Sequence, residues 1–154
     1  MLKKQRFLFQ FSEALHLPSP FLVHIQHYRV FLRITLERLA HNDGYDKPDV
    51  EDNCPAGECC VPGAAAVQTT CLDLERVCSE VNTASLQAGL GVEACVSEDA
   101  GRYLCDFVYC KSLVSMAGRS LFIHVPPTDQ PYSTEQVTQA IKLVLQSLIK
   151  QIQP

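Results

Sequence analysis

Residues 92–125 have the sequence VEACVSEDAGRYLCDFVYCKSLVSMAGRSLFIHV, and three parts of this stretch differ in their periodicity. Residues 92–96 are mostly small or apolar and follow a glycine-rich break, which favours a strand. Residues 103–116 carry apolar side chains at helical spacing and stop close to a glycine, the residue type that commonly ends a helix. Residues 121–125 form a compact apolar run that two prolines terminate. The stretch therefore predicts a strand, a helix and a second strand.

Similar patterns lie on both sides of this stretch. Residues 72–81 have apolar positions three and four apart, which is typical of a helix, and residues 30–39 are apolar and β-branched, which is typical of a strand. Near the C-terminus, Ser133 and Gln136 form a capping box, and apolar residues then follow at helical spacing as far as Ile152. Alternating helices and strands predict the α/β class, here a three-layer α/β/α arrangement with a mainly parallel, twisted sheet.

The composition is that of one folded domain. The chain has 154 residues, of which 47% are hydrophobic and 19% charged, an ordinary globular balance. A formal net charge of -4 provides no positive field for nucleic acid or for an anionic membrane surface. No apolar run approaches the roughly 20 residues of a membrane-spanning helix. We therefore expect neither nucleic acid nor membrane as a partner.

The chain has eight cysteines, an even number that is typical of small disulfide-bonded secreted domains. Its N-terminal residues lack the uninterrupted apolar run and the cleavage site of a secretory signal, so we expect a cytosolic protein with reduced thiols. Cys54, Cys59 and Cys60 cluster, but without the histidine or second cysteine pair of a structural zinc site. No metal is predicted; a secreted module stabilised by zinc or disulfides is the weaker alternative.

Two residues on separate predicted elements have the chemistry of a cysteine hydrolase. Cys105 falls in the first turn of the helix predicted over 103–116, where exposed N–H groups and partial positive charge favour a thiolate. His124 falls at the end of the strand predicted over 121–125. If the strands over 92–96 and 121–125 are neighbours, Cys105 and His124 can meet as nucleophile and general base.

Such a pair also needs a carboxylate that orients the imidazole, and the spacing leaves this choice open. Glu37, on the strand predicted over 30–39, is one candidate. Asp99 and Asp106 are sequence neighbours of the thiol and suit the geometry less well. A cysteine on an amphipathic helix more often serves packing alone, and Cys110 is assigned that role.

Three segments around these residues resemble, in the same order along the chain, motifs of the vertebrate pyroglutamyl-peptidase I family. AGRYLCDF at 100–107 is similar to the nucleophile motif of that family, and FIHVPP at 122–127 is similar to its histidine motif. ITLER at 34–38, followed by HNDGY at 41–45, resembles the strand that carries the family's catalytic glutamate. DNC and ECCV within residues 52–61 resemble its cysteine-bearing loop. Several motifs in order are a far more specific signal than any one of them.

The resemblance implies a function and a role for each candidate residue. The family consists of cysteine peptidases that remove an N-terminal pyroglutamate from blocked peptides through an acyl-enzyme, in the cytosol, without metal or cofactor. Cys105 then corresponds to the nucleophile, His124 to the general base and acid, and Glu37 to the group that orients the imidazole. Tyr103 and Leu104 match positions that help to form the pocket for the lactam ring. No oligomeric state is predicted.

The likeness does not extend over the whole chain. It divides the sequence into a divergent segment, residues 1–30, and a pyroglutamyl-peptidase-like α/β domain, residues 31–154. Family members begin with strands and a Gly-Phe-Gly-Pro-Phe-like loop that lines the lactam pocket, and this sequence has no counterpart of them. The loss of core strands and of one pocket wall predicts weak or no activity. The alternative function is therefore a catalytically weak or inactive paralogue or fragment that acts, if at all, by binding a partner.

Overall fold

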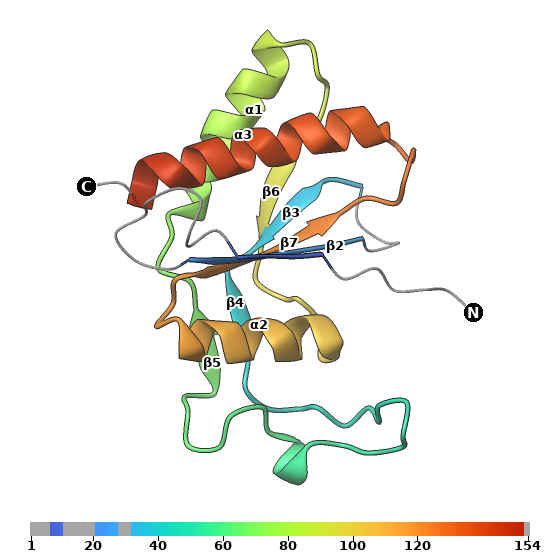
Figure 1. The fold of residues 1–154 in the computed structure, drawn as a ribbon, viewed down its shortest axis with the longest axis vertical. Helices are drawn as coiled ribbons and strands as arrows, with labels where there is room; N and C mark the ends of the chain where they lie inside the picture. Colours follow the sequence, from blue (N-terminus) through green and yellow to red (C-terminus); the bar gives the residue numbers. More distant parts are fainter. Residues whose placement is uncertain (1–6, 11–20, 28–31, 153–154) are drawn as a thin grey trace.

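A five-stranded sheet forms the centre of the molecule, whose computed structural model describes residues 7–10, 21–27 and 32–152 (Figure 1). The strand order is β1-β2-β7-β3-β6. These strands are β1 (Phe7–Gln10), β2 (Leu22–His27), β7 (Ser120–Val125), β3 (Ile34–Glu37) and β6 (Ala94–Ser97). β2 pairs with β7 and β3 pairs with β6 in parallel, whereas β1 with β2 and β3 with β7 are antiparallel. The sheet is therefore mixed, with two parallel and two antiparallel pairs, and not mainly parallel as predicted.

Alternation along the strands gives the sheet two different faces. Successive strand residues point to opposite faces, so every second residue of β7 and of its neighbours belongs to the same layer. One face is apolar, with Val23, Ile34, Leu36, Leu121 and Ile123 buried in the main hydrophobic core. The opposite face carries polar and aromatic side chains, namely those of His24, Thr35, Glu37, Phe122 and His124.

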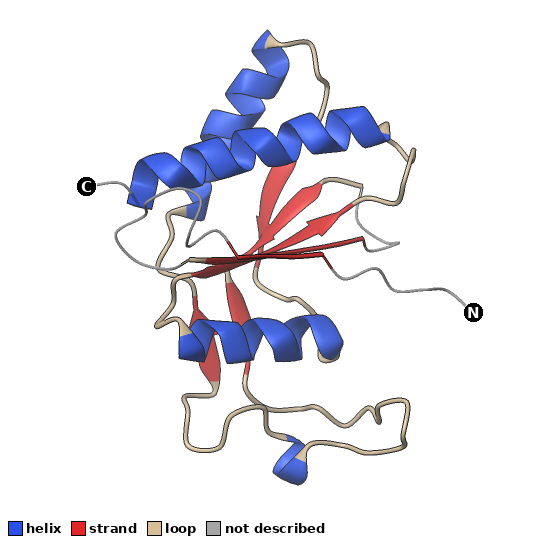
Figure 2. Ribbon diagram, viewed as in Figure 1, coloured by secondary structure: helices blue, strands red, loops and turns tan. Residues whose placement is uncertain are grey.

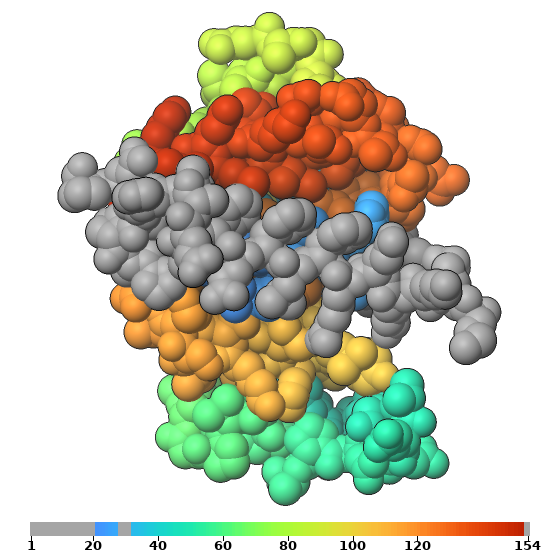
Figure 3. Space-filling view, viewed as in Figure 1, coloured from blue at the N-terminus to red at the C-terminus, as the bar shows by residue number. Residues whose placement is uncertain are grey.

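Helices cover both faces and complete three layers (Figure 2). α1 (Leu74–Gln87) and α3 (Thr134–Ile152) pack on each other and on the apolar face. α2 (Leu104–Ser115) lies on the polar face, together with a small second sheet of β4 (Leu39–His41) and β5 (Val67–Thr69). In the space-filling view, α3 (red to orange) lies above and α2 (orange to yellow) lies below, with the long loop that contains the short helix η1 (Ala56–Glu58) at the bottom (Figure 3).

Local sequence explains where two of the helices begin and end. Gly118 has φ +81°, a conformation that costs glycine little, and its N–H donates to the carbonyl of Leu113 at 2.8 Å, so α2 ends with the chain turned toward β7. At the start of α3, the Ser133 N–H donates to Gln136 Oε1 at 2.8 Å and the Gln136 N–H donates to Ser133 Oγ at 3.2 Å. The predicted capping box is confirmed.

The α/β class and the three layers are confirmed. The pairing of the strands, in contrast, could not be read from the sequence pattern. The strand predicted over 30–39 is divided: at Arg38, whose N–H donates to the Ser97 carbonyl at 2.8 Å, the chain leaves the main sheet, and β4 pairs with β5 instead. Residues 28–31 lie outside the described residues. The segment 1–30 contains β2, at 22–27, which pairs with β7. Residues 1–6, 11–20 and 28–30 of that segment lie outside the described residues as well.

The condition on which Cys105 and His124 were expected to meet is wrong. β6 and β7 are not neighbours, because β3 lies between them and runs antiparallel to β7. Strand adjacency depends on long-range pairing, which the periodicity of a single segment does not encode. Any approach of the two residues must therefore come from the way α2 crosses the polar face.

All eight cysteines are within the described residues, and none of them forms a disulfide. No helix in the described part of the chain is both long enough and apolar enough to cross a bilayer.

Candidate active site

A buried histidine–carboxylate pair lies on the polar face of the sheet. His124 Nδ1 is 2.7 Å from Glu37 Oε1, and the two side chains are 1% and 0% exposed. Their strands are adjacent: Thr35 is the direct partner of His124 in the antiparallel ladder, so Glu37, two residues further on, lies on the same face. Of the three carboxylates considered from the sequence, Glu37 is the one that contacts the imidazole.

The contact with Glu37 fixes the orientation of the His124 ring. An imidazole whose Nδ1–H donates to a carboxylate has its Nε2 on the far side of the ring as the basic atom. The other carboxylate oxygen of Glu37 is buried and has no hydrogen-bond partner among the described residues. The Phe122 ring packs 4.9 Å from the His124 ring, centroid to centroid, and limits its rotation. This arrangement can hold an imidazole ready for proton transfer.

Cys105 lies in the first turn of α2, the helix that covers this face, and its side chain is partly buried. Tyr109, one turn further along, anchors the helix on the sheet: its ring lies 5.8 Å from the Phe122 ring, and its hydroxyl donates to the Glu37 carbonyl at 2.7 Å. α2 is thus fixed to both strands that carry the histidine–carboxylate pair. The sequence did not reveal this role of Tyr109, which depends on the crossing of helix and sheet.

Tyr103 and Leu104, the predicted pocket residues, immediately precede the thiol. Tyr103 is the N-cap residue of α2 and its hydroxyl lies 3.5 Å from the Pro48 carbonyl, in the long loop after β4. The two residues are 38% and 37% exposed. They present apolar surface beside Cys105 that a compact, uncharged group could cover.

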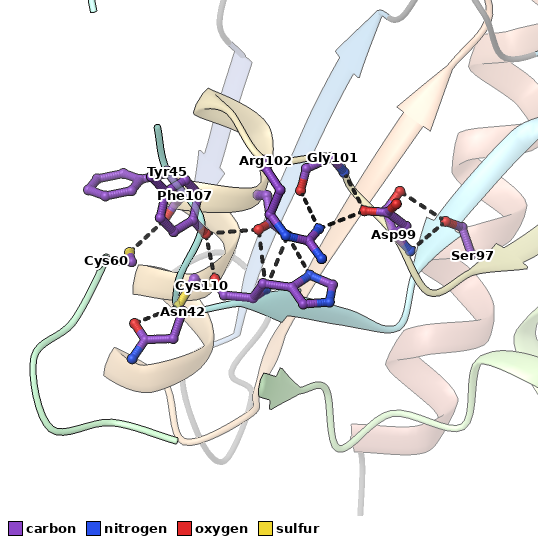
Figure 4. Close-up of polar contacts among 11 residues, drawn as sticks. Asn42, Tyr45, Cys60, Ser97, Asp99, Gly101, Arg102, Phe107 and Cys110 are labelled. Carbon is purple, nitrogen blue, oxygen red and sulfur yellow. Dashed lines mark hydrogen bonds and ion pairs between the residues drawn. The ribbon is translucent and has the colours of Figure 1, made fainter. Parts of the chain in front are cut away.

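Asp106 is a buried carboxyl that contributes to the site without touching Glu37. Its Oδ2 lies 2.8 Å from the Tyr45 hydroxyl oxygen, within hydrogen-bond distance, and both of its oxygens lie 3.2 Å from the backbone nitrogen of His41. The Tyr45 hydroxyl donates to the His41 carbonyl. Figure 4 draws these contacts, with Tyr45, Phe107 and Arg102 labelled around them. Burial raises the pKa of Asp106, although the donors from Tyr45 and His41 act in the opposite direction.

The other carboxylate near the thiol, Asp99, belongs to the loop before α2. It accepts from Arg102 Nη1 at 2.8 Å and from the Gly101 N–H at 3.0 Å, and the Asp99 N–H donates to Ser97 Oγ at 3.1 Å (Figure 4). These contacts shape the loop that leads from β6 into α2. The prediction that Asp99 and Asp106 suit the role of orienting acid less well agrees with these positions.

Two further cysteines lie close to the candidate nucleophile but in apolar surroundings. Cys110 is fully buried, and its thiol lies 3.6 Å from the side-chain oxygen of Asn42; the Cys60 thiol donates to the Phe107 carbonyl at 3.3 Å. Burial raises the pKa of Cys110 to about 12 and also raises the pKa of Cys60. Both belong to the small apolar cluster under α2, so the assignment of Cys110 to packing is confirmed. Within the described ranges, no group of three or more His, Cys, Asp or Glu side chains is placed to hold a metal ion.

Comparison with known proteins gives one consistent result. Residues 9–129 match the PgaPase_1 model of pyroglutamyl peptidases. The chain is 38% identical over 128 residues to human pyroglutamyl-peptidase 1, a match that covers 83% of this chain and 59% of the relative. It is 31% identical over 131 residues to the human pyroglutamyl-peptidase 1-like protein, which covers 85% of this chain and 64% of that protein.

Two solved structures show the similarity of fold. The pyroglutamyl peptidase I of Bacillus amyloliquefaciens superposes with a TM-score of 0.67 at 25% identity, over 81% of this chain and 63% of that one. A mutant pyrrolidone carboxyl peptidase of Pyrococcus furiosus superposes with a TM-score of 0.72 at 25% identity, over 85% and 69%. The chain thus spans roughly six-tenths of the length of its curated relatives.

Proposed function

We propose that this chain, which belongs to the pyroglutamyl peptidase family, is a cysteine peptidase that removes N-terminal pyroglutamate from peptides, with Cys105 as nucleophile, His124 as general base and acid, and Glu37 as the carboxylate that orients the imidazole. The observation that carries the proposal is the buried contact of 2.7 Å between His124 Nδ1 and Glu37 Oε1. A buried pair of this kind provides the histidine and the acid of a Cys-His-acid triad, and it lies beneath a helix that bears a cysteine.

The path of α2 across the sheet supports a place for Cys105 in this triad. A short turn joins α2 to β7, so the helix packs on the strand while running in the opposite direction (Figure 1). Tyr109 lies over Phe122. From that crossing point, Cys105 is four residues back along the helix, about 6 Å, and on the same helix face. His124 is two residues forward along the strand, about 6.6 Å, and on the same sheet face. Both steps lead toward the same end of the layer.

In the proposed reaction, His124 acts first as a base and then as an acid in each of two steps. His124 takes the proton from the Cys105 thiol, and the thiolate sulfur bonds to the carbonyl carbon of the pyroglutamyl residue. The carbon–nitrogen bond to the next residue breaks as the imidazolium gives its proton to the departing amine, which leaves a thioester. Water then adds to the thioester carbonyl as His124 takes its proton; the carbon–sulfur bond breaks, free pyroglutamic acid leaves, and the imidazolium returns its proton to the sulfur to regenerate the thiol. The exposed apolar surface of Tyr103 and Leu104 suits an uncharged lactam ring.

Release of a fluorogenic amine from its pyroglutamyl amide tests the proposal directly. We expect the wild-type chain to release the amine. Cys105→Ser or His124→Ala should lower kcat by about a thousandfold or more, because the loss of either member of a nucleophile–base pair disables the whole pair. Glu37→Gln keeps the shape of the pair but removes its charge, and we expect a loss of about 10²- to 10⁴-fold. Cys54→Ser, the same thiol change at an exposed position, should leave kcat unchanged.

The same assay separates this function from the alternative expected from the sequence. Amine release that persists in Cys105→Ser contradicts the proposal. Absence of release by well-folded wild-type protein favours the non-catalytic alternative. Turnover equal to that of human pyroglutamyl-peptidase 1, measured in parallel, contradicts the expectation of weak activity.

A further inference from the structure

Asp106 occupies an unusual position for a carboxyl group. It directly follows Cys105 in the first turn of α2, yet its side chain is 0% exposed and points away from the solvent that an N-terminal helical acid usually meets. An acidic side chain is almost never fully buried without specific partners, because the loss of hydration is costly. Its burial therefore indicates that its contacts matter more than its charge.

The contacts of Asp106 reach one short segment of the chain, residues 41–45. The carboxyl oxygens accept from the backbone N–H of His41, at the end of β4, and one of them is hydrogen-bonded to the hydroxyl of Tyr45, four residues later. In addition, the imidazole Nδ1 of His41 lies 3.8 Å from Asp106 Oδ1. One side chain thus closes a loop from both of its ends.

That segment is continuous with the strand that bears Glu37. Only Arg38 separates β3, which ends at Glu37, from β4, which ends at His41. The Tyr45 ring also packs edge-on against the Phe107 ring at 5.1 Å, on the residue that follows Asp106. The first turn of α2 is therefore joined, by a carboxyl contact and an aromatic contact, to the segment that directly follows the glutamate strand.

We infer that Asp106 is a positioning residue for the nucleophile: by binding His41 and Tyr45, it fixes the first turn of α2, and with it Cys105, relative to the Glu37–His124 pair. This inference rests on the proposed function. Asp106 itself touches neither the substrate nor the reacting atoms. Its effect is geometric, and displacement of a reacting group by 1 Å can cost about 10²-fold in rate.

The hydrogen bonds predict which substitution preserves this role. The Tyr45 hydroxyl has one proton but contacts two acceptors, Asp106 Oδ2 and the His41 carbonyl. Both contacts are satisfied together only when the Asp106 group itself donates to the Tyr45 oxygen. An asparagine reproduces that pattern, since its Nδ2–H donates to Tyr45 and its Oδ1 accepts from the His41 N–H. Asp106→Asn should therefore preserve the positioning role, whereas Asp106→Ala and Asp106→Leu should lose it.

The test measures alkylation of Cys105 by iodoacetamide as a function of pH in the folded chain, together with kcat and KM for a pyroglutamyl amide. In Asp106→Ala and Asp106→Leu, we expect slower alkylation at neutral pH, an apparent thiol pKa nearer the ordinary value of about 8.5, and kcat lowered by about 10- to 100-fold with KM little changed. Asp106→Asn should behave like the wild type in both measurements. Tyr45→Phe removes only the hydroxyl, so its alkylation rate and kcat should lie between those of the wild type and those of Asp106→Ala.

A control separates positioning from stability alone. Ser85→Ala removes two buried hydrogen bonds, to the carbonyl and the N–H of Val92, on the opposite side of the sheet. It should lower the midpoint of thermal unfolding without moving the alkylation profile. A leucine or alanine variant of Asp106 that is folded and has the wild-type alkylation profile overturns the inference, as does an ordinary thiol profile in the wild type itself.

The two measurements also separate this inference from the proposed function. A wild-type chain that does not hydrolyse the amide, but whose alkylation profile still depends on Asp106, refutes the peptidase function and supports the positioning role. Hydrolysis that is equal in the wild type and in Asp106→Ala refutes the positioning role and leaves the function in place.

Discussion

At the scale of single residues, two buried carboxyl groups on the side of the sheet that α2 covers differ through their partners. Glu37 meets an imidazole, which can carry the compensating positive charge. Asp106 is hydrogen-bonded to a hydroxyl and a backbone N–H, both neutral, and the His41 imidazole lies farther away, at 3.8 Å from Oδ1. Ionisation of a buried carboxyl is costly unless a charge or several donors compensate it. The first group is therefore suited to orienting the histidine and stabilising its charged form, and the second to holding chain segments together.

The thiols provide a prediction at this scale. Burial raises the pKa of Cys78 and of Cys110 to about 12, so neither supplies much thiolate at neutral pH. We expect iodoacetamide to modify the exposed Cys54 and Cys71 readily, and Cys105 faster than both, while Cys78 and Cys110 stay unmodified until the chain unfolds. Peptide mapping by mass spectrometry over time measures all of these rates in one sample. Modification of Cys110 as fast as Cys54 contradicts the assignment of Cys110 to packing.

At the scale of elements, the capping box of Ser133 and Gln136 stabilises the N-terminal end of α3. Ser133→Ala removes the acceptor for the Gln136 N–H, and we expect the free energy of unfolding to fall by about 1 kcal/mol. Thr138, whose hydroxyl donates to the carbonyl of Thr134 within the exposed part of the same helix, is the matched control. Thr138→Ala should cost less than Ser133→Ala or raise stability, because alanine is the better helix former. Urea unfolding measures both, and equal losses contradict the role of the cap.

The elements also show how far the sequence alone could predict the fold. Helical and strand periodicity located α2, α3 and β7 within a residue or two, because local spacing decides which face of each element is apolar. The same patterns could not reveal that β3 lies between β6 and β7, since this depends on contacts between segments far apart in the chain. They also gave β5 no signal, because three exposed or half-exposed residues have no apolar periodicity.

The candidate site divides in the same way. Glu37 and His124 were predicted as partners only through resemblance to a family, and the structure brings them into contact. Tyr109, Tyr45 and the role of Asp106 were not predicted. Each acts through a contact with a distant segment that appears only when α2 lies across the polar face. Sequence motifs thus indicated the reacting groups, whereas the groups that position them required the packing of the layers.

At the scale of the whole molecule, the buried Asp106 couples stability to pH. The groups that face it are the Tyr45 hydroxyl, the backbone and imidazole of His41, the Arg102 guanidinium and the Cys110 thiol. Burial, the largest effect, raises the pKa of this carboxyl above its ordinary value of 3.8. A carboxyl with a raised pKa in the folded state favours folding in its protonated form. Its contribution is complete below pH 3.8 and is lost as the pH rises through the raised pKa.

Asp106→Asn removes this titration while keeping the shape and the hydrogen bonds of the neutral carboxyl. The free energy of unfolding of the wild type, minus that of Asp106→Asn, should therefore be largest at acid pH and should fall as the pH rises above the ordinary aspartate value. Urea unfolding of both proteins, from about pH 4 to about pH 8, measures this difference, and contributions from the other carboxylates cancel because both chains carry them. His41→Gln in both backgrounds accounts for any change in the charge of that imidazole, which lies 3.8 Å away. A difference that is constant, or that grows with pH, means that Asp106 is ionised at no cost in the folded chain, and the neutral hydrogen-bond pattern assigned to it is then wrong.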